Sequence, residues 1–112
     1  MIKRGDIYYL NKHYNSDNVQ LGRRPVIIIQ NNVGNNNSPT TIVVPLTSKL
    51  KRPIPTHCFI SKRDGGLNLN STALCEQIFT VNKADLEKYI GTVTNTRTLK
   101  RLNRCIQISL NL

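Results

Sequence analysis

At 112 residues the chain has the length of one domain, 1–112, and is too short for two separately folding cores. Sixteen Lys and Arg against six Asp and Glu give a formal net charge of +10, which favours a polyanion such as nucleic acid, although an acidic protein partner or a merely solubilising surface also fits the charge. Membrane classes are excluded, because no apolar run approaches the roughly 18 residues of a membrane helix, and we therefore expect a soluble, cytoplasmic protein.

The N-terminal half of the chain is predicted to consist mostly of strands. "GDIYYL" has the aromatic and β-branched character of a first strand, and a polar loop follows it over 11–22. Pro25 begins a second strand, which "VIIIQ" carries into the core. "NNVGNNNSPT" predicts a turn, because Asn and Gly accept left-handed backbone. "TTIVVPLTS" predicts a third strand, and Pro45 suggests an edge or a bulge near its end.

The C-terminal half is predicted to add two strands and two helices. "THCFIS" and "STALCEQIFTVN" favour strands, separated by a turn at "RDGGLNLN", and "NKADLEKY" favours a short helix. Leu99, Leu102, Ile106 and Leu110 recur at three- and four-residue intervals, which indicates one amphipathic helix, capped by Asn95 or Thr96. Short strands covered by such a helix suggest a small, partly open β-barrel or a two-sheet β+α domain.

Metal-binding patterns are missing from the sequence. Cys58, Cys75 and Cys105 show no CxxC pair and no His at ligand spacing, so we interpret them as small buried hydrophobes. The six carboxylates form no DxD pair and no ExK motif after an upstream Asp, and we predict no metal site. Cleavage of a nucleic acid would then need a nucleophile on the substrate itself, the ribose 2′-hydroxyl of RNA. His13 and His57 are the only histidines, and His57 opens a strand, where packing is its commoner role.

Five blocks in order, "IKRGDIYY", "RRPVIIIQNNVGN", "SPTTIVVPLTSK", "PTHCFI" and "CEQIFTV", resemble the MazF/PemK family of toxin endoribonucleases, and the similarity covers nearly the whole chain. The resemblance implies an SH3-like barrel with a C-terminal helix, a homodimer, and cleavage of single-stranded mRNA that needs no metal or cofactor and inhibits translation. The expected products are a 2′,3′-cyclic phosphate and a 5′-hydroxyl. A cognate antitoxin with an acidic, flexible tail is also implied.

The resemblance assigns catalysis to Arg24 and Thr47, which match the family's RPV and TSK blocks. A guanidinium is permanently cationic, so we assign Arg24 chiefly to stabilising charge on the phosphorane, while Thr47 bonds a phosphate oxygen or orients the 2′-hydroxyl. Arg23 is predicted to be a general phosphate contact or simply solvated. The other predicted RNA contacts are Asn18, Gln20, Ser48, Lys49, His57, Gln77 and Phe79.

Two departures from the family pattern concern base recognition. Val19 stands near a position that is acidic in many members, with Asp17 shifted, and Phe79 stands where many members have Arg. A stacking surface at Phe79 can replace the lost cation, and the cleaved sequence does not carry over from the family.

Two rival functions stay open. The same barrel serves toxins that poison DNA gyrase, although those rely on a C-terminal Trp and this chain has none. A non-catalytic RNA-binding barrel is the other alternative.

Overall fold

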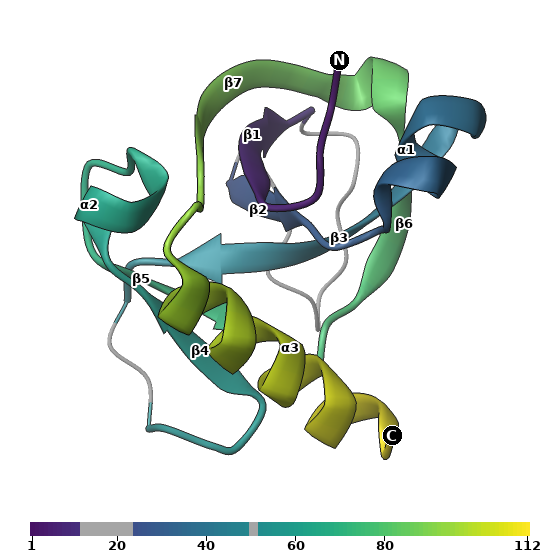
Figure 1. Cartoon of the computed structure of the whole chain (residues 1–112). Helices are drawn as coiled ribbons and strands as arrows, with labels where there is room; N and C mark the ends of the chain where they lie inside the picture. Colours follow the sequence, from purple (N-terminus) through teal and green to yellow (C-terminus); the bar gives the residue numbers. More distant parts are fainter. Residues whose placement is uncertain (12–23, 50–51) are drawn as a thin grey trace.

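The computed structural model describes residues 1–11, 24–49 and 52–112, in which seven strands build one antiparallel sheet (Figure 1). The sheet order is β4-β5-β3-β2-β1-β7, and β6 pairs with β3 beside this path. The strands are β1 (Asp6–Leu10), β2 (Pro25–Ile28), β3 (Thr40–Thr47), β4 (His57–Ile60), β5 (Ser71–Leu74), β6 (Phe79–Asn82) and β7 (Leu86–Thr92). The helices are α1 (Asn32–Asn37), α2 (Lys62–Gly65), the 3₁₀ helix η1 (Lys83–Asp85) and α3 (Thr96–Leu110).

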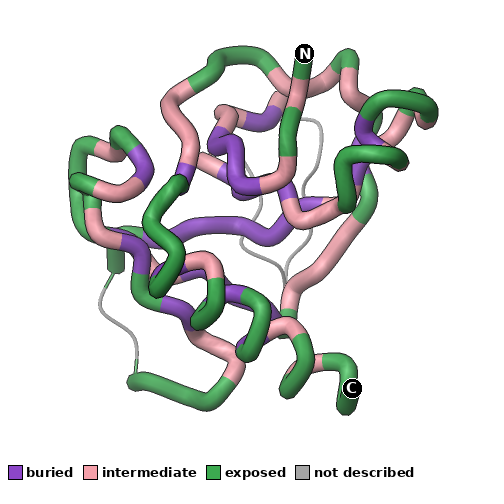
Figure 2. The backbone as a smooth tube through the Cα atoms, viewed as in Figure 1, coloured by how far each residue is buried: buried purple, intermediate pink, exposed green. Residues whose placement is uncertain are grey.

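The sheet curls into a barrel that stays partly open, because the two ends of the path, β4 and β7, do not pair within the described residues. This confirms the predicted fold class of a small barrel with a C-terminal helix. Figure 2 shows that the buried residues are concentrated on β1, β2 and β3 and under α3. No helix in the described part of the chain is both long and apolar enough to cross a bilayer.

Strand β3 is the centre of the barrel. It pairs with β2 on one side, and on the other side with β6 through Thr40–Val43 and with β5 through Leu46 and Thr47. Pro45 lies between these last two pairings, where one partner strand replaces the other. Of the two alternatives expected at Pro45, the edge is wrong because β3 pairs on both sides, and the β2–β3 register runs up to Pro45 without the shift that a bulge would give. The missing N–H falls where the ladder changes partner.

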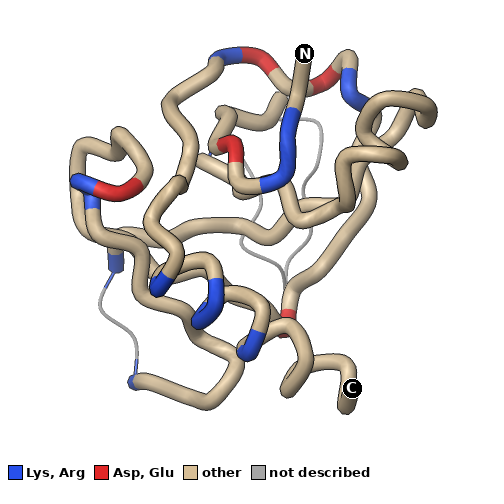
Figure 3. The backbone as a smooth tube through the Cα atoms, in the orientation of Figure 1, with Lys and Arg blue, Asp and Glu red and all other residues tan. Residues whose placement is uncertain are grey.

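Helix α3 packs its apolar side on β4, as its spacing predicts. Asn95 caps it, accepting from the N–H of Arg97 at 3.0 Å and of Thr98 at 3.3 Å. Leu102 is fully buried in the larger core cluster, and Leu99 and Ile106 pack against that cluster. Leu110 is 52% exposed, so its assignment to the buried face is wrong. The exposed sides carry the basic residues of the helix, visible in Figure 3.

We expect Leu102→Ala to lower the free energy of unfolding by roughly 2–5 kcal/mol, because truncation leaves a cavity between α3 and the sheet. Urea denaturation followed by circular dichroism measures the change. Leu69→Ala is the matched control, since Leu69 is 61% exposed and its truncation opens no cavity. An equal loss of stability in both variants would contradict the docking of α3 on the core.

Four other predicted segments differ in the structure. "STALCEQIFTVN" is two strands, because the chain turns at Cys75 and Glu76, where the N–H of Gln77 donates to Leu74 O at 2.9 Å. The predicted helix over 82–89 is the single turn η1 followed by strand β7. Both predicted turns contain short helices, α1 in "NNVGNNNSPT" and α2 in "RDGGLNLN".

Candidate active site

Arg24 and Thr47 meet at one rim of the barrel, because β2 and β3 are antiparallel neighbours. Their register pairs Val26 with Pro45, and continuing it by two residues places Arg24 opposite Thr47. Nη1 of Arg24 lies 3.4 Å from Oγ1 of Thr47, to which it donates. This hydrogen bond brings together the two side chains to which the family resemblance assigns catalysis.

The hydroxyl of Thr47 is held firmly in place. Thr47 is 2% exposed, and its Oγ1 also accepts from the backbone N–H of Lys49 at 3.2 Å. In both of these hydrogen bonds Oγ1 is the acceptor. The hydrogen of the hydroxyl itself has no acceptor among the described residues. It is therefore free to donate to an oxygen of a bound substrate.

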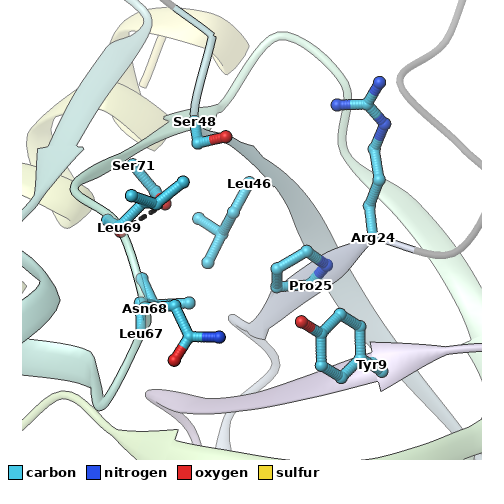
Figure 4. Close-up of a pocket in the computed structure, with 9 residues that line it drawn as sticks. All are labelled: Tyr9, Arg24, Pro25, Leu46, Ser48, Leu67, Asn68, Leu69 and Ser71. Carbon is cyan, nitrogen blue, oxygen red and sulfur yellow. Dashed lines mark hydrogen bonds between the residues drawn. The ribbon is translucent and has the colours of Figure 1, made fainter.

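Arg24 borders a cavity of about 550 Å³, which we call the Arg24 cavity (Figure 4). Figure 4 shows the hydroxyl of Ser48 turned toward Arg24, and the ring of Tyr9 and the carboxamide of Asn68 on opposite sides of the opening. The full lining is Tyr9, Arg24, Pro25, Leu46, Ser48, Leu67, Asn68, Leu69 and Ser71. Most of these residues come from strand ends or from the loop between α2 and β5.

A second cavity of about 540 Å³, the His57 cavity, continues the first, because Ser48, Leu69 and Ser71 line both. Its lining is Thr47, Ser48, Lys49, Pro53, His57, Phe59, Leu69, Asn70, Ser71 and Thr72. The described residues that line the two cavities include the cations Arg24 and Lys49 and no carboxylate. The two cavities therefore form one groove whose charge suits a polyanion.

His57 is fixed by Glu76 beneath the second cavity. Its Nε2 lies 3.1 Å from Oε2 of Glu76, whose Oε1 accepts from Oγ1 of Thr56 at 3.3 Å. The His57 side chain is 9% exposed, and its Nδ1 is buried with no partner among the described residues. The proton of the neutral ring therefore belongs on Nε2, and His57 acts as a wall of the groove rather than as a neighbour of Arg24.

The three cysteines are buried and unpaired, as expected from their spacing. Burial raises the pKa of the Cys58 thiol to about 12 and also raises the pKa of Cys75 and Cys105. A thiol attacks or binds a metal as its thiolate, so burial disfavours either role for these groups. Among the described residues no three His, Cys, Asp or Glu side chains gather in a metal-binding group.

The predicted RNA contacts fall into three sets. Ser48, Lys49 and His57 lie with Thr47 around the second cavity. Gln77 and Phe79 are outside the described lining of either cavity; Gln77 follows the turn after β5, and Phe79 packs partly buried against the smaller core cluster. The predictions for Arg23, Asn18 and Gln20 fall outside the described residues.

Sequence reasoning missed several lining residues, and those with polar side chains are Tyr9, Asn68, Asn70, Ser71 and Thr72. Tyr9 lies in a predicted strand, and the alternation of side chains along that strand did not indicate which face would line the groove. Asn68 stood in a segment interpreted only as a turn. The polar run "NLNS" was the available signal, but only the fold brings it opposite Arg24.

Comparison with known proteins places the chain in a family. The family model for PemK-like, MazF-like toxins of type II toxin–antitoxin systems matches residues 3–110. The chain belongs to this family. A family relative from Staphylococcus saprophyticus, named Endoribonuclease MazF, is 41% identical over 113 residues, which span 100% of this chain and 93% of the relative.

Solved structures of the family share the fold. A mycobacterial endoribonuclease in complex with its cognate antitoxin is 27% identical, with a TM-score of 0.83 over 100% of this chain and 97% of that one. MazF from Deinococcus radiodurans is 16% identical, with a TM-score of 0.81 over 99% of this chain and 97% of that one. At that identity the likeness shows the fold alone.

Proposed function

We propose that the chain is a toxin endoribonuclease that cuts single-stranded mRNA at short sequences without a metal ion. The observation that carries the proposal is the pairing of Arg24 with Thr47 at the edge of a groove whose described lining holds no carboxylate. A fixed cation and an orientable hydroxyl are the groups that phosphodiester transesterification needs when the nucleophile belongs to the substrate.

The enzyme class rests on the family and its relatives. The chain is an endoribonuclease toxin by its membership of the family and by its 41% identity to an Endoribonuclease MazF. The solved complex of a mycobacterial relative with its cognate antitoxin supports a neutralising antitoxin for this chain also. We propose that this antitoxin has an acidic, flexible segment that competes with RNA for the groove, and that the toxin acts as a homodimer.

The reaction is a transesterification within the RNA strand. The 2′-oxygen forms a bond to the adjacent phosphorus as its proton passes to a water molecule, and the bond from phosphorus to the 5′-oxygen breaks as that oxygen takes a proton from water. Negative charge grows on the non-bridging oxygens in between. The Arg24 guanidinium stabilises that charge with two parallel N–H donors, and Thr47 donates to a phosphate oxygen or orients the 2′-hydroxyl.

The groove supplies the positioning. Ser48 and Lys49 lie beside Thr47 and contribute a hydroxyl and a cation to the same strand of RNA. The buried wall of His57 and the apolar faces of Phe59 and Leu69 suit unstacked bases. A strand held this way brings the 2′-hydroxyl in line with the 5′-oxygen, which is the geometric requirement of the step.

Incubating the purified protein with a long RNA in EDTA tests the proposal. We expect defined fragments that carry 2′,3′-cyclic phosphate and 5′-hydroxyl ends, and the sequences of the 5′ ends give the cleaved motif. Retention of intact RNA would support a binding module instead. An absence of both binding and cutting would revive the gyrase-poisoning alternative, and a requirement for Mg²⁺ would contradict the metal-free mechanism.

A further inference from the structure

A third and smaller cavity of about 180 Å³ adjoins the Arg24 cavity, because Tyr9, Leu67 and Asn68 line both. Strand β7 supplies its other wall, including Lys88. The volume is below the roughly 300–1,000 Å³ of a site for a whole small molecule. It suits one planar ring, and its contact with the Arg24 cavity places such a ring next to the proposed scissile phosphate.

Tyr9 and Lys88 present an aromatic ring and a cation on the same face of the sheet. They are register partners across β1 and β7, and directly opposed residues of an antiparallel pair project to the same side. Lys88 is exposed and has no carboxylate partner among the described residues. The cation is therefore available to an incoming anion.

The wall opposite Tyr9 is fixed by a close contact between the end of α2 and β7. Gly66 has φ +69°, and a Cβ on it would lie 3.0 Å from the carbonyl oxygen of Ile90. A Cβ on Gly91 would collide with the carbonyl oxygen of Gly65. Only glycines allow this approach, which holds Leu67 and Asn68 beside β7 in the absence of a ligand.

We propose that this third cavity is a subsite for the base of a nucleotide that flanks the cleaved bond. The Tyr9 ring stacks on the base, the Asn68 carboxamide donates to and accepts from its edge, and Lys88 pairs with the adjoining phosphate. This proposal rests on the proposed function and adds a position at which the RNA sequence is sensed. A single cation beside a ring and a carboxamide favours a nucleotide over an acidic peptide, which needs several cations.

Binding of an RNA that cannot be cut tests the subsite separately from catalysis. The probe is a fluorescent RNA that contains the motif cut by the wild-type protein, with a 2′-O-methyl group at the cleaved nucleotide, titrated by anisotropy at several salt concentrations. We expect Asn68→Ala to weaken binding roughly tenfold. We expect Lys88→Gln to reduce the slope of log affinity against log salt by about 0.7, the value for one phosphate on a single strand.

Matched controls separate this effect from a general loss of charge or of fold. Lys100→Gln removes the same charge from the exposed side of α3, which lines none of the three cavities, and should leave affinity nearly unchanged. Thermal melting by circular dichroism checks that each variant folds. Sequencing of cut ends should show that Asn68→Ala relaxes base preference at one flanking position.

Two outcomes would overturn the subsite. The first is that the wild-type protein cleaves RNA and that both variants keep its affinity, salt slope and cut-site preference. The second is weakened binding of an acidic antitoxin peptide with RNA binding intact. Failure of the wild-type protein to cleave would instead contradict the proposed function, and the cleavage assay, which precedes the titration and supplies its motif, distinguishes the two cases.

Discussion

Replacing Arg24 by Ala is expected to reduce the rate of RNA cleavage roughly 10²- to 10³-fold, the usual cost of removing one preorganised donor from a developing oxyanion. The side chain is only partly buried, and the hydrogen bond that it donates goes to Thr47. Its removal should therefore leave the fold intact. RNA affinity should fall only a few-fold, because other cations in the groove remain. Single-turnover kinetics with enzyme in excess measure the chemical step directly.

Two further variants test whether the loss of rate is specific to the guanidinium of Arg24. Arg24→Lys should recover only part of the rate, because an ammonium cannot make the two parallel bonds of a guanidinium. Arg104→Ala removes the same charge from the exposed side of α3 and should cleave at the wild-type rate. Full activity of Arg24→Ala would remove the mechanism, and equal losses in Arg24→Ala and Arg104→Ala would reduce Arg24 to a general electrostatic role.

A single 2′-deoxy nucleotide at the cleaved position of an otherwise normal RNA should abolish cutting at that bond. The substitution removes the nucleophile and leaves the strand, its charge and its bases in place. Affinity for the protein should be nearly unchanged. Gel analysis of end-labelled RNA with the deoxy group at the cut site, compared with the same group one nucleotide away, measures the effect.

Cleavage of the deoxy substrate at the normal rate would mean that water is the nucleophile. In that case the products would carry no cyclic phosphate, and a group that activates water would have to be found near Arg24. Blocked cleavage at the cut site, with normal cleavage when the deoxy group is displaced, supports attack by the ribose itself.

The places of Arg24 and Thr47 at strand ends could be predicted because they depend only on local facts, whereas their roles came from the family resemblance. Pro25 and the aliphatic run after it defined the start of β2, and "PLTS" defined the end of β3. Two antiparallel neighbours then bring those ends together. Helix α3 was predictable for a similar reason, since its cap and its apolar spacing lie within one continuous stretch.

Strand β7 could not be predicted, because its local sequence favours another structure. The segment "ADLEKY" is rich in helix formers, and β7 buries too little for an alternating pattern to appear. Pairing with β1 along five register positions decides the outcome, and this pairing depends on a strand that lies far away in sequence.

Helix α2 was missed although its signals are present in the sequence. Ser61 caps its first turn, with Oγ accepting from the N–H of Arg63 at 3.3 Å, and Gly66 ends it in left-handed backbone. The two adjacent glycines favoured a simple turn instead. The third cavity could not be predicted either, because the end of α2 forms part of it.

In the proposed function, the cutting chemistry and the choice of target belong to different parts of the fold. Arg24 and Thr47 lie at adjoining ends of the two central strands β2 and β3, whereas Leu67, Asn68 and Leu69 lie in a surface connection. Under that proposal, substitutions in the connection alter which RNA sequence is cut and leave the catalytic pair in place. A toxin of this kind can then acquire a new target while it keeps its mechanism.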